Sequence, residues 1–483
     1  MTRSTATLTR AAVPRSFSSR PRIRLGWLAV AAAAFAGGVV LAGLGARVGS
    51  AGPLVMVLAP VALLGAAAIL ARPALGVAAV FLSFPVGFVA LPVGSLDIKV
   101  VEAMAAVAVG LIVLRRISAA ASPLPWAPQM WWGLGLVAMA LVATPGALDG
   151  TEALKQDGLL AVGFLFALAI PAAIRSMREL RGVVGVLLAV GTGIAAYGFK
   201  GVSHLQASFG GTVVTNRAQG LFAQPNELGA FSAAMMMLAI GLLLGARSGW
   251  VRMAAAVAVV VDFVALALSL SRGAWMGTAF AAAVLLAVLP QARRALLSVG
   301  LPVLIVAAVA VSVFLPASPL PGAVKVVEQR IGTLTHPTIA VNPYDIRPQI
   351  WHEAELLIQE HPWTGIGPGN FPVATELDNR LPEPIDHAHD VLLTVAAEVG
   401  IPGALALIGL TLALALLARR VVRGFPDPLD RAVLAGIAAA LATQIGHGVV
   451  DFILRNAVLF LLMWALAGML LAAGRLLDQE EPA

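Results

Sequence analysis

Apolar segments of about 20 residues, separated by short polar or basic stretches, follow one another along almost the whole chain of 483 residues. A helix needs about that length of apolar sequence to cross the hydrocarbon core of a bilayer. The segments are rich in Ala, Val, Leu and Gly and do not alternate between polar and apolar positions, which favours helices over the strands of a membrane barrel. We therefore predict an all-α polytopic membrane protein.

The composition excludes other classes. Hydrophobic residues make up 59% of the chain and charged residues only 12%, whereas a soluble globular protein has about 25% charged residues. The formal net charge of +7 does not indicate a nucleic-acid partner, because the basic residues lie at the ends of apolar segments and are not clustered on one face. The absence of cysteine excludes disulfides, thiolate chemistry and cysteine-ligated metals.

The segments predict about 12 to 14 transmembrane helices. The first, 25–46, is longer than the apolar part of a signal peptide, which favours a membrane anchor. Pro85 and Pro92 make the third segment the least regular one. The remaining spans are expected at 52–71, 74–92, 98–114, 127–146, 158–174, 180–199, 228–246, 251–269, 274–290, 296–316, 391–418, 432–451 and 457–473.

This pattern divides the chain into five parts. Residues 1–24 are rich in Ser, Thr and Arg and are expected to form a disordered cytoplasmic tail. A transmembrane bundle follows at 25–316, then an extracytoplasmic loop with short helices at 317–390, further transmembrane helices at 391–474, and a cytoplasmic tail at 475–483.

The basic residues predict which side of the membrane each loop faces. With the amino terminus inside, about two-thirds of the 32 Lys and Arg residues fall on the cytoplasmic side, as expected for a bacterial inner membrane protein. Both termini are then cytoplasmic. Four single arginines share the outer face with the long loop: Arg217, Arg272, Arg347 and Arg455. They stand within short motifs, unlike the paired arginines at the inner helix ends.

Within the loop, residues 347–359 are predicted to form an amphipathic helix, because apolar residues recur at 350, 354, 357 and 358. Pro348 suits the first turn of that helix. The following glycines, Gly365, Gly367 and Gly369, lack the Lys-Ser/Thr of a nucleotide-binding loop and are expected to form a tight turn with close backbone packing.

Two histidines, His387 and His389, are flanked by carboxylates in residues 386–390, which end with Asp390. Imidazole and carboxylate groups suit Zn²⁺ or Mn²⁺. Alternatively, one histidine is a general base that a carboxylate orients. A third interpretation is structural, with Asp390 at the start of a helix, where the dipole favours negative charge. The residues of this motif leave the three interpretations open.

Charged residues also lie at the ends of predicted spans. Arg272 stands between two spans, where a charge is costly unless it faces a cavity or a partner, whereas Arg217 could extend its side chain to the membrane surface. His447, Asp451 and Arg455 recur at intervals of four, which predicts one helical face directed into the bundle. That face could be a structural ladder of ion pairs or could support a site.

Several motifs in order resemble the O-antigen ligase and O-antigen polymerase superfamily of bacterial membrane glycosyltransferases. They are Arg217-Ala218-Gln219-Gly220-Leu221-Phe222 with Asn226, Ser271-Arg272-Gly273, Arg347 with Trp351, Pro362 with the glycines that precede Phe371, and His389 ahead of Gly400 and Gly403. The resemblance covers roughly residues 200–470. Asp390 departs from the amide or serine that commonly follows the family's histidine.

The resemblance implies a helical bundle with a large extracytoplasmic loop over a cavity, and a glycan donor on a polyprenyl diphosphate, usually undecaprenyl diphosphate. It implies that His389 is the catalytic residue, that Arg217 and Arg272 bind the diphosphate, and that Arg347 is a loop candidate for substrate binding. His387, Asp390, His447, Asp451 and Arg455 would support the site. No metal or other cofactor is expected.

The alternative is a transporter or flippase of lipid-linked sugars or small anions. A transporter is expected to contain inverted repeats or helices broken at the membrane midplane, and the sequence shows no clear repeat. Between ligase and polymerase, which share a donor and differ in the hydroxyl acceptor, the sequence does not discriminate. Both would serve the biosynthesis of polysaccharide for the cell envelope.

Overall fold

The computed structural model describes residues 52–93, 96–119, 125–199, 206–207, 214–215, 217–290, 292–295, 346–378, 380–381 and 385–480. The chain divides into two compact units, Met1–Ala71 and Arg72–Ala483. In the first unit, helix α2 spans Gly52–Ala71. The expected tail 1–24, the expected spans 25–46 and 296–316, and the loop residues 317–345 lie outside the described residues.

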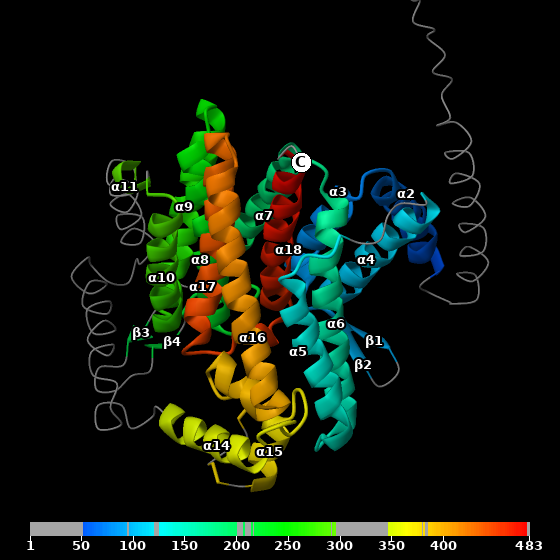
Figure 1. Cartoon of the computed structure of the whole chain (residues 1–483), viewed down its shortest axis with the longest axis vertical. Helices are drawn as coiled ribbons and strands as arrows, with labels where there is room; N and C mark the ends of the chain where they lie inside the picture. The colour runs from blue at the N-terminus through cyan, green and yellow to red at the C-terminus, as the bar shows by residue number, and fades with distance from the viewer. Residues whose placement is uncertain are drawn as a thin grey trace, which may run out of the picture. The chain divides into compact units, whose positions relative to one another are not determined.

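The second unit consists almost entirely of helices (Figure 1). Its first part contains α3 Ala74–Leu82, η2 Phe84–Val86, β1 Ala90–Val93, β2 Leu96–Lys99, α4 Val100–Ser118, α5 Met130–Ala143, η3 Thr144–Gly146, α6 Gly150–Ala173 and α7 Met177–Tyr197. Its second part contains β3 Gln206–Ala207, β4 Val214–Thr215, α8 Pro225–Gly245, α9 Gly249–Ser269, α10 Arg272–Val288, α11 Ala292–Ala295, α14 Arg347–Glu360, α15 Phe371–Asp378, α16 Val391–Gly424, α17 Pro428–Gly448, η6 Ile453–Arg455 and α18 Ala457–Glu480.

Seven helices in the described part of the chain are long and apolar enough to cross a membrane, namely α6, α7, α8, α9, α16, α17 and α18. Shorter apolar helices at Ala62–Ala71, Ala74–Val86, Met130–Gly146 and Arg272–Val288 coincide with four more of the expected spans. The prediction of an all-α polytopic membrane protein is confirmed. The lipid-facing character is visible on α16, where Leu405, Leu412 and Leu416 are 57 to 69% exposed.

One expected span differs from the structure. The sequence predicts a helix over 74–92, but α3 ends at Leu82 and the chain then forms a short 3-10 turn and the antiparallel hairpin of β1 and β2. Ala90 pairs with Lys99 in this hairpin. The reason is the pair of prolines, because Pro85 and Pro92 lack the N–H that a continuous helix needs.

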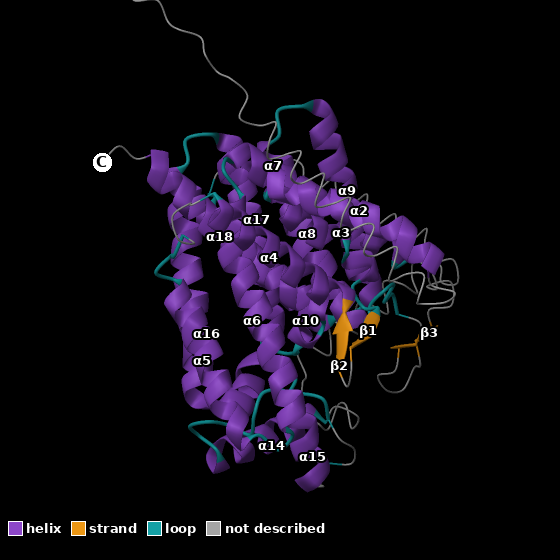
Figure 2. Cartoon of the chain, turned by 90° about the vertical axis from the view of Figure 1, so that its right-hand side faces the viewer, coloured by secondary structure: helices purple, strands orange, loops and turns teal. Residues whose placement is uncertain are grey.

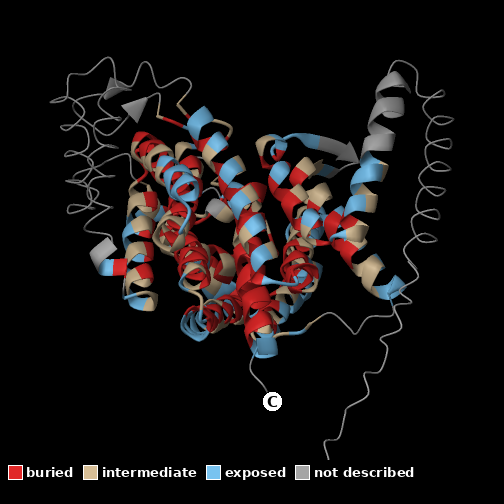
Figure 3. Ribbon diagram, turned by 90° about the horizontal axis from the view of Figure 1, so that it is seen from above, coloured by how far each residue is buried: buried red, intermediate tan, exposed pale blue. Residues whose placement is uncertain are grey.

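Helix α17 lies against both α8 and α10 through small residues. Figure 3 shows the buried residues, drawn in red, gathered on the inner sides of the helices. Gly241 of α8 and Gly436 of α17 meet backbone to backbone, since a Cβ on Gly241 would lie 2.7 Å from the Cα of Gly436. Gly277 of α10 is equally close to α17, where its Cβ would meet the Thr443 carbonyl oxygen at 2.5 Å. Such contacts are how membrane helices approach closely, and they fix the end of α17 beside the start of α10.

Helices α14 and α15 lie at one end of the bundle, which we call the loop end (Figures 1 and 2). The helix predicted over 347–359 is confirmed as α14, whose apolar face packs on α16. The glycine turn is also confirmed: Gly365 has φ +65° and lies against the backbone of Glu398, where any Cβ would collide. At Gly400, φ +82°, the first turns of α16 meet the rest of the helix at a kink.

Candidate active site at the loop end

His389 lies just before α16 and joins the loop to the end of α17. Its Nδ1 is 3.0 Å from Oδ1 of Asp451, 62 residues further along the chain. The backbone of His389 is in the left-handed region, φ 51°, which is strained for a residue with a side chain. Such outliers persist where the surroundings determine them, and they cluster at functional sites. The side chain remains 26% exposed.

Asp390, the next residue, is the N-cap of α16. Its carboxylate accepts a hydrogen bond from the Leu393 N–H at 2.8 Å, and this satisfies one of the donors that the first turn of any helix leaves unpaired. Burial raises the pKa of the Asp390 carboxyl, although the N–H groups of the first turn oppose this. Asp390 therefore fits the structural interpretation of this motif, as the cap of a helix. His389 makes a different contact, with Asp451.

Asp451 is the centre of the site. The sequence predicts that His447, Asp451 and Arg455 share one helical face, and this is wrong, because α17 ends at Gly448 and Asp451 follows in a turn. Asp451 is 3% exposed. Oδ2 of Asp451 accepts a hydrogen bond from Asn226 at 2.8 Å, and the Nε2 of His447 lies 3.8 Å away, too far for a hydrogen bond but close enough to act electrostatically.

The protonation of this pair follows from the same contacts. Burial raises the pKa of the Asp451 carboxyl, but the hydrogen bond with His389 and the proximity of His447 outweigh burial and hold that pKa well below its usual range. An ionised carboxylate can only accept hydrogen bonds. The proton between the two groups is therefore on Nδ1 of His389, which leaves Nε2 as a proton acceptor.

Arg217 reaches the same carboxylate through one intermediary. Its Nη2 donates to Oδ1 of Asn226 at 2.9 Å, and the amide of Asn226 donates in turn to Asp451. Its Nε donates to the Ser269 carbonyl oxygen at 2.7 Å. Asn226 stands in the first turn of α8, so the fold joins three distant segments in one chain of hydrogen bonds.

Arg272 begins α10, only three residues after the Ser269 carbonyl that Arg217 contacts. Ser271 caps this helix by accepting the Ala274 N–H. The next residue, Gly273, lies against the ring of His447, because its Cβ would be 2.8 Å from Nε2. The start of α10 therefore lies beside the Asp451 network. Arg217 contacts Ser269 in the turn that leads into α10, and Arg272 begins that helix, so this turn is common to the two arginines predicted to bind one ligand.

His387 packs inside the loop beside the site. Its Nδ1 accepts the backbone N–H of His389 at 3.2 Å, and its ring meets the ring of His389 edge-on at 4.4 Å. Burial, together with the nearby His389, lowers the pKa of His387 to about 4. His387 is therefore neutral near pH 7 and holds the strained backbone of His389 as a hydrogen-bond acceptor.

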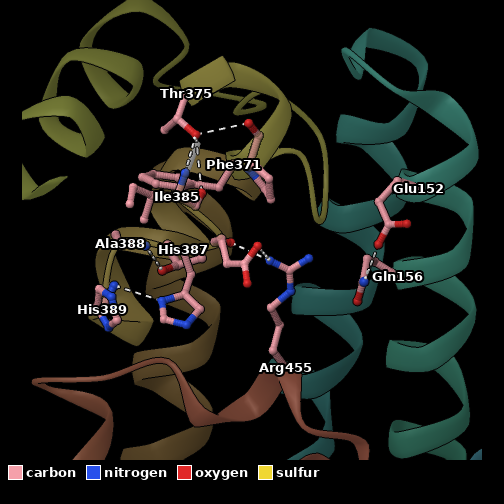
Figure 4. A network of polar contacts seen from close by, with 12 residues as sticks. Glu152, Gln156, Phe371, Thr375, Ile385, His387, Ala388, His389 and Arg455 are labelled. Carbon is pink, nitrogen blue, oxygen red and sulfur yellow. Dashed lines mark hydrogen bonds and ion pairs between the residues drawn. The ribbon is translucent and has the colours of Figure 1, made fainter. Parts of the chain in front are cut away.

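Arg455 points away from Asp451, contrary to the predicted ladder. It lies in η6, and its Nη1 donates to the Asp386 carbonyl oxygen at 2.7 Å and pairs with the Asp386 carboxylate at 3.3 Å. Figure 4 shows the guanidinium group between this loop and α6, which carries Glu152 and Gln156. Arg455 therefore anchors the loop at Asp386, three residues before His389, to the segment that holds Asp451.

A mostly apolar cavity of about 110 Å³ lies beside this anchor. Gln156, Glu398 and Arg455 give it polar groups at one side, and side chains such as Leu159 and Trp464 line the rest. The Glu398 carboxylate also accepts the Phe371 N–H at 3.2 Å, which secures the glycine turn. The cavity joins the loop end to the interior between α5, α6, α16 and α18.

Three of the predicted groups also resemble a metal site. Ligand atoms of His387, His389 and Asp451 lie within 4.8 Å of one another. Two of these groups already use their Nδ1 atoms, since His387 accepts a backbone N–H there and His389 binds Asp451. A metal would have to use the remaining ring nitrogens. The general-base interpretation requires no change in these two hydrogen bonds.

Sequence reasoning found most of these residues but not all of their connections. Arg347 is the first residue of α14, and its role remains a prediction. Asn226 was recognised only as part of a motif, and its place between Arg217 and Asp451 depends on the fold. Asn370 was missed; it accepts the Asp149 N–H and so holds the glycine turn against the start of α6. An amide directly after a glycine-rich turn was the available signal.

Comparisons with known proteins give one family match. No curated protein matches the chain. A solved structure titled "Structural coordination of polymerization and crosslinking by a peptidoglycan synthase complex" matches at 20% identity and a TM-score of 0.41. The match covers 74% of this chain and 100% of that one. A family model described as O-Antigen ligase matches residues 257–408, which include Arg272, Arg347 and His389. The match confirms the resemblance of residues 257–408 to the O-antigen ligase and polymerase superfamily.

Proposed function

We propose that this protein transfers a glycan from a polyprenyl diphosphate donor, such as undecaprenyl diphosphate, to an acceptor hydroxyl at the extracytoplasmic face of the bacterial inner membrane. The observation that carries the proposal is the hydrogen bond of His389 to Asp451, in a network that also reaches Arg217. The family match favours glycosyl transfer over a transporter or flippase.

In this mechanism Asp451 accepts the Nδ1–H of His389 and leaves Nε2 to take the proton of the acceptor hydroxyl. The acceptor oxygen attacks the anomeric carbon, and the bond from that carbon to the diphosphate oxygen breaks, so the diphosphate leaves with the electron pair. Asp451 stabilises the imidazolium that forms, as a buried carboxylate does for other catalytic histidines.

Arg217 and Arg272 supply the positive charge for the leaving group. Guanidinium groups bind phosphoryl oxygens in a bidentate manner, and their attraction grows as negative charge develops on the diphosphate. The hydrogen bonds of Arg217 to Ser269 and Asn226 hold its guanidinium group in place before the substrate arrives. Preorganisation of this kind is a large part of electrostatic catalysis.

The test is glycan transfer from a polyprenyl diphosphate-linked donor by purified protein or membranes. His389→Ala and Arg272→Ala, at membrane levels equal to those of the unchanged protein, should abolish the product. His361→Ala is the matched control, because His361 is an exposed histidine of the same loop. Undiminished product in both site variants, or movement of the donor across proteoliposomes without a new glycosidic bond, would contradict the proposal.

A further inference from the structure

A second polar hollow lies at the opposite end of the bundle from His389. Helix α18 begins beside the loop-end site and carries Arg475 near its other end, about 27 Å away at 1.5 Å per residue. There a cavity of about 250 Å³ opens between the ends of α4, α6 and α18. Its lining consists of Pro73, Ile112, Arg115, Arg116, Ala119, Ala172, Arg175 and Arg475.

Four of these eight lining residues are arginines, and none is acidic. They come from three separate parts of the fold, since Arg115 and Arg116 end α4, Arg175 follows α6 and Arg475 belongs to α18. The guanidinium groups repel one another in pairs, Arg115 with Arg175 and Arg116 with Arg475. A convergence of like charges on one hollow is unfavourable unless an anion offsets it.

Two nearby protein groups contact these arginines. The Glu179 carboxylate attracts Arg115, but it also accepts the backbone N–H of Arg175 at 2.7 Å, beside the cavity and not in its lining. Arg475 donates from Nη2 to the Ile174 carbonyl oxygen at 2.6 Å, while its Nε is buried with no hydrogen-bond partner among the described residues. A buried donor of this kind indicates a missing acceptor.

Topology alone does not account for the arrangement. Arginines that only set the orientation of a membrane protein need to lie near helix ends, where they reach the headgroup region separately. Arg178 and Arg252 fit that description, because both are exposed and neither lines this cavity. The four lining arginines instead share one cavity that an anion can enter.

We propose that this cavity binds a ligand with one or two phosphoryl groups. Guanidinium groups recognise phosphate oxygens in a bidentate manner, and four of them match the charge of a diphosphate or of two phosphodiesters. Two sources share this chemistry: the headgroup of an anionic phospholipid, since basic pockets between membrane helices bind such headgroups, and free phosphate or diphosphate. The site is separate from the glycan-transfer site and does not depend on the function proposed for it.

The test uses the full chain in neutral detergent. Cardiolipin, phosphatidylglycerol and phosphatidylcholine are added in turn, and bound lipid is measured by native mass spectrometry; phosphate and diphosphate are titrated by calorimetry against sulfate at equal ionic strength. Retention of cardiolipin over phosphatidylcholine identifies a lipid headgroup, and binding of diphosphate alone identifies a soluble anion. Either result supports the site.

The variants decide whether the arginines carry the binding. The double variant Arg116→Gln and Arg475→Gln should weaken it by about tenfold or more, because it removes two charge-assisted contacts. Arg178→Gln is the matched control and should bind like the unchanged protein. Should the double variant unfold, the single variant Arg116→Lys keeps the charge and should still bind more weakly. Equal binding in all variants, or no preference for any phosphate probe over its control, would overturn the proposal.

Discussion

Helix α17 carries a buried carboxylate near each of its ends, and their partners differ. Asp430, in its first turn, pairs with the guanidinium group of Arg181 at 2.9 Å. Asp451, three residues beyond its last turn, has two histidines and an amide as its side-chain neighbours. Asp430 and the last residue of α17, Gly448, lie about 27 Å apart along the helix.

The difference shows what each carboxylate can do. A permanent cation neutralises Asp430, so this pair ties α7 to α17 and has no proton to exchange. Asp451 has no arginine or lysine among its hydrogen-bond partners in the described part of the chain, and one of its partners, His389, is partly exposed. Burying a carboxylate without a permanent counterion destabilises the folded protein. A carboxylate that orients a catalytic base has a functional reason to be buried in this way.

The largest effect is expected from Asp451→Asn. Oδ2 of Asp451 accepts the Asn226 amide, and Oδ1 contacts both His389 and the Phe452 N–H, so the new NH₂ must face one of these donors; where the bond with Asn226 is kept, the NH₂ faces His389. The imidazole would then accept at Nδ1 and carry its proton on Nε2, the wrong tautomer for a base. Transfer should fall by about 10³-fold or more.

The matched control for this variant is Asp430→Asn at the other end of α17, which should leave the transfer rate per folded molecule unchanged. Initial rates with a polyprenyl diphosphate donor measure both. Equal losses in the two variants would show that the carboxylates do not differ in role.

A smaller effect concerns His387 and pH. Its folded pKa is about 4 against an ordinary value of 6.5, so as the pH falls through this window the unfolded chain binds a proton that the folded chain excludes. The free energy of unfolding should therefore have its full value above pH 6.5 and should decrease by roughly 3 kcal/mol toward pH 4. Thermal unfolding in detergent measures this, and His387→Asn should flatten the profile.

The control for pH is His361→Asn, which replaces an exposed histidine of the same loop. It should keep the pH profile of the unchanged protein. If His387→Asn retains the full decrease between pH 6.5 and 4, another group is responsible for it.

Asn226→Leu should cost less than the Asp451 variant. Leucine has a similar size but neither accepts from Arg217 nor donates to Asp451. Replacing a residue that orients a catalytic group without contacting the substrate typically lowers activity by about 10- to 100-fold. We expect a loss in that range. Gln349→Leu, at an exposed position of α14, is the matched amide replacement and should have no effect.

The smallest effect is expected at Asp390. Loss of an N-cap costs about 1 kcal/mol of stability, so Asp390→Ala should lower the Tm slightly, while Asp390→Asn keeps an acceptor for the Leu393 N–H and should not. The transfer rate per folded molecule should stay close to that of the unchanged protein in both. A loss of transfer as large as that of Asp451→Asn would place Asp390 in the chemistry.

Much of the fold could be predicted from the sequence, because hydrophobic length and periodicity are local properties. The spans from 98 to 269 and the helix at 347–359 are present as helices. The hairpin at β1 and β2 could not be distinguished from membrane helix by hydropathy, since its residues are equally apolar. The interruption came from Pro85 and Pro92, whose effect depends on the neighbours that satisfy the freed carbonyls.

The site was predicted as a set of residues, while its connections required the fold. Periodicity placed Asp451 and Arg455 on one face, but the end of α17 at Gly448 separates them. The contact between His389 and Asp451 joins segments 62 residues apart and leaves no local pattern. The single arginines at the loop end differ from the paired arginines elsewhere, and this difference predicts a function for them. The cavity shared by Arg116 and Arg475 could not be predicted, because these two residues come together only in the folded chain.

The central claim is that Asp451 acts through His389, and a double-mutant cycle of these two residues tests it most directly. Single-turnover transfer is measured for Asp451→Asn, His389→Ala and the double variant, with enzyme in excess over a polyprenyl diphosphate donor. If the carboxylate works by orienting the imidazole, Asp451→Asn should cause no further loss once His389 is alanine. If the two losses instead multiply, Asp451 acts independently of His389 and the account is wrong.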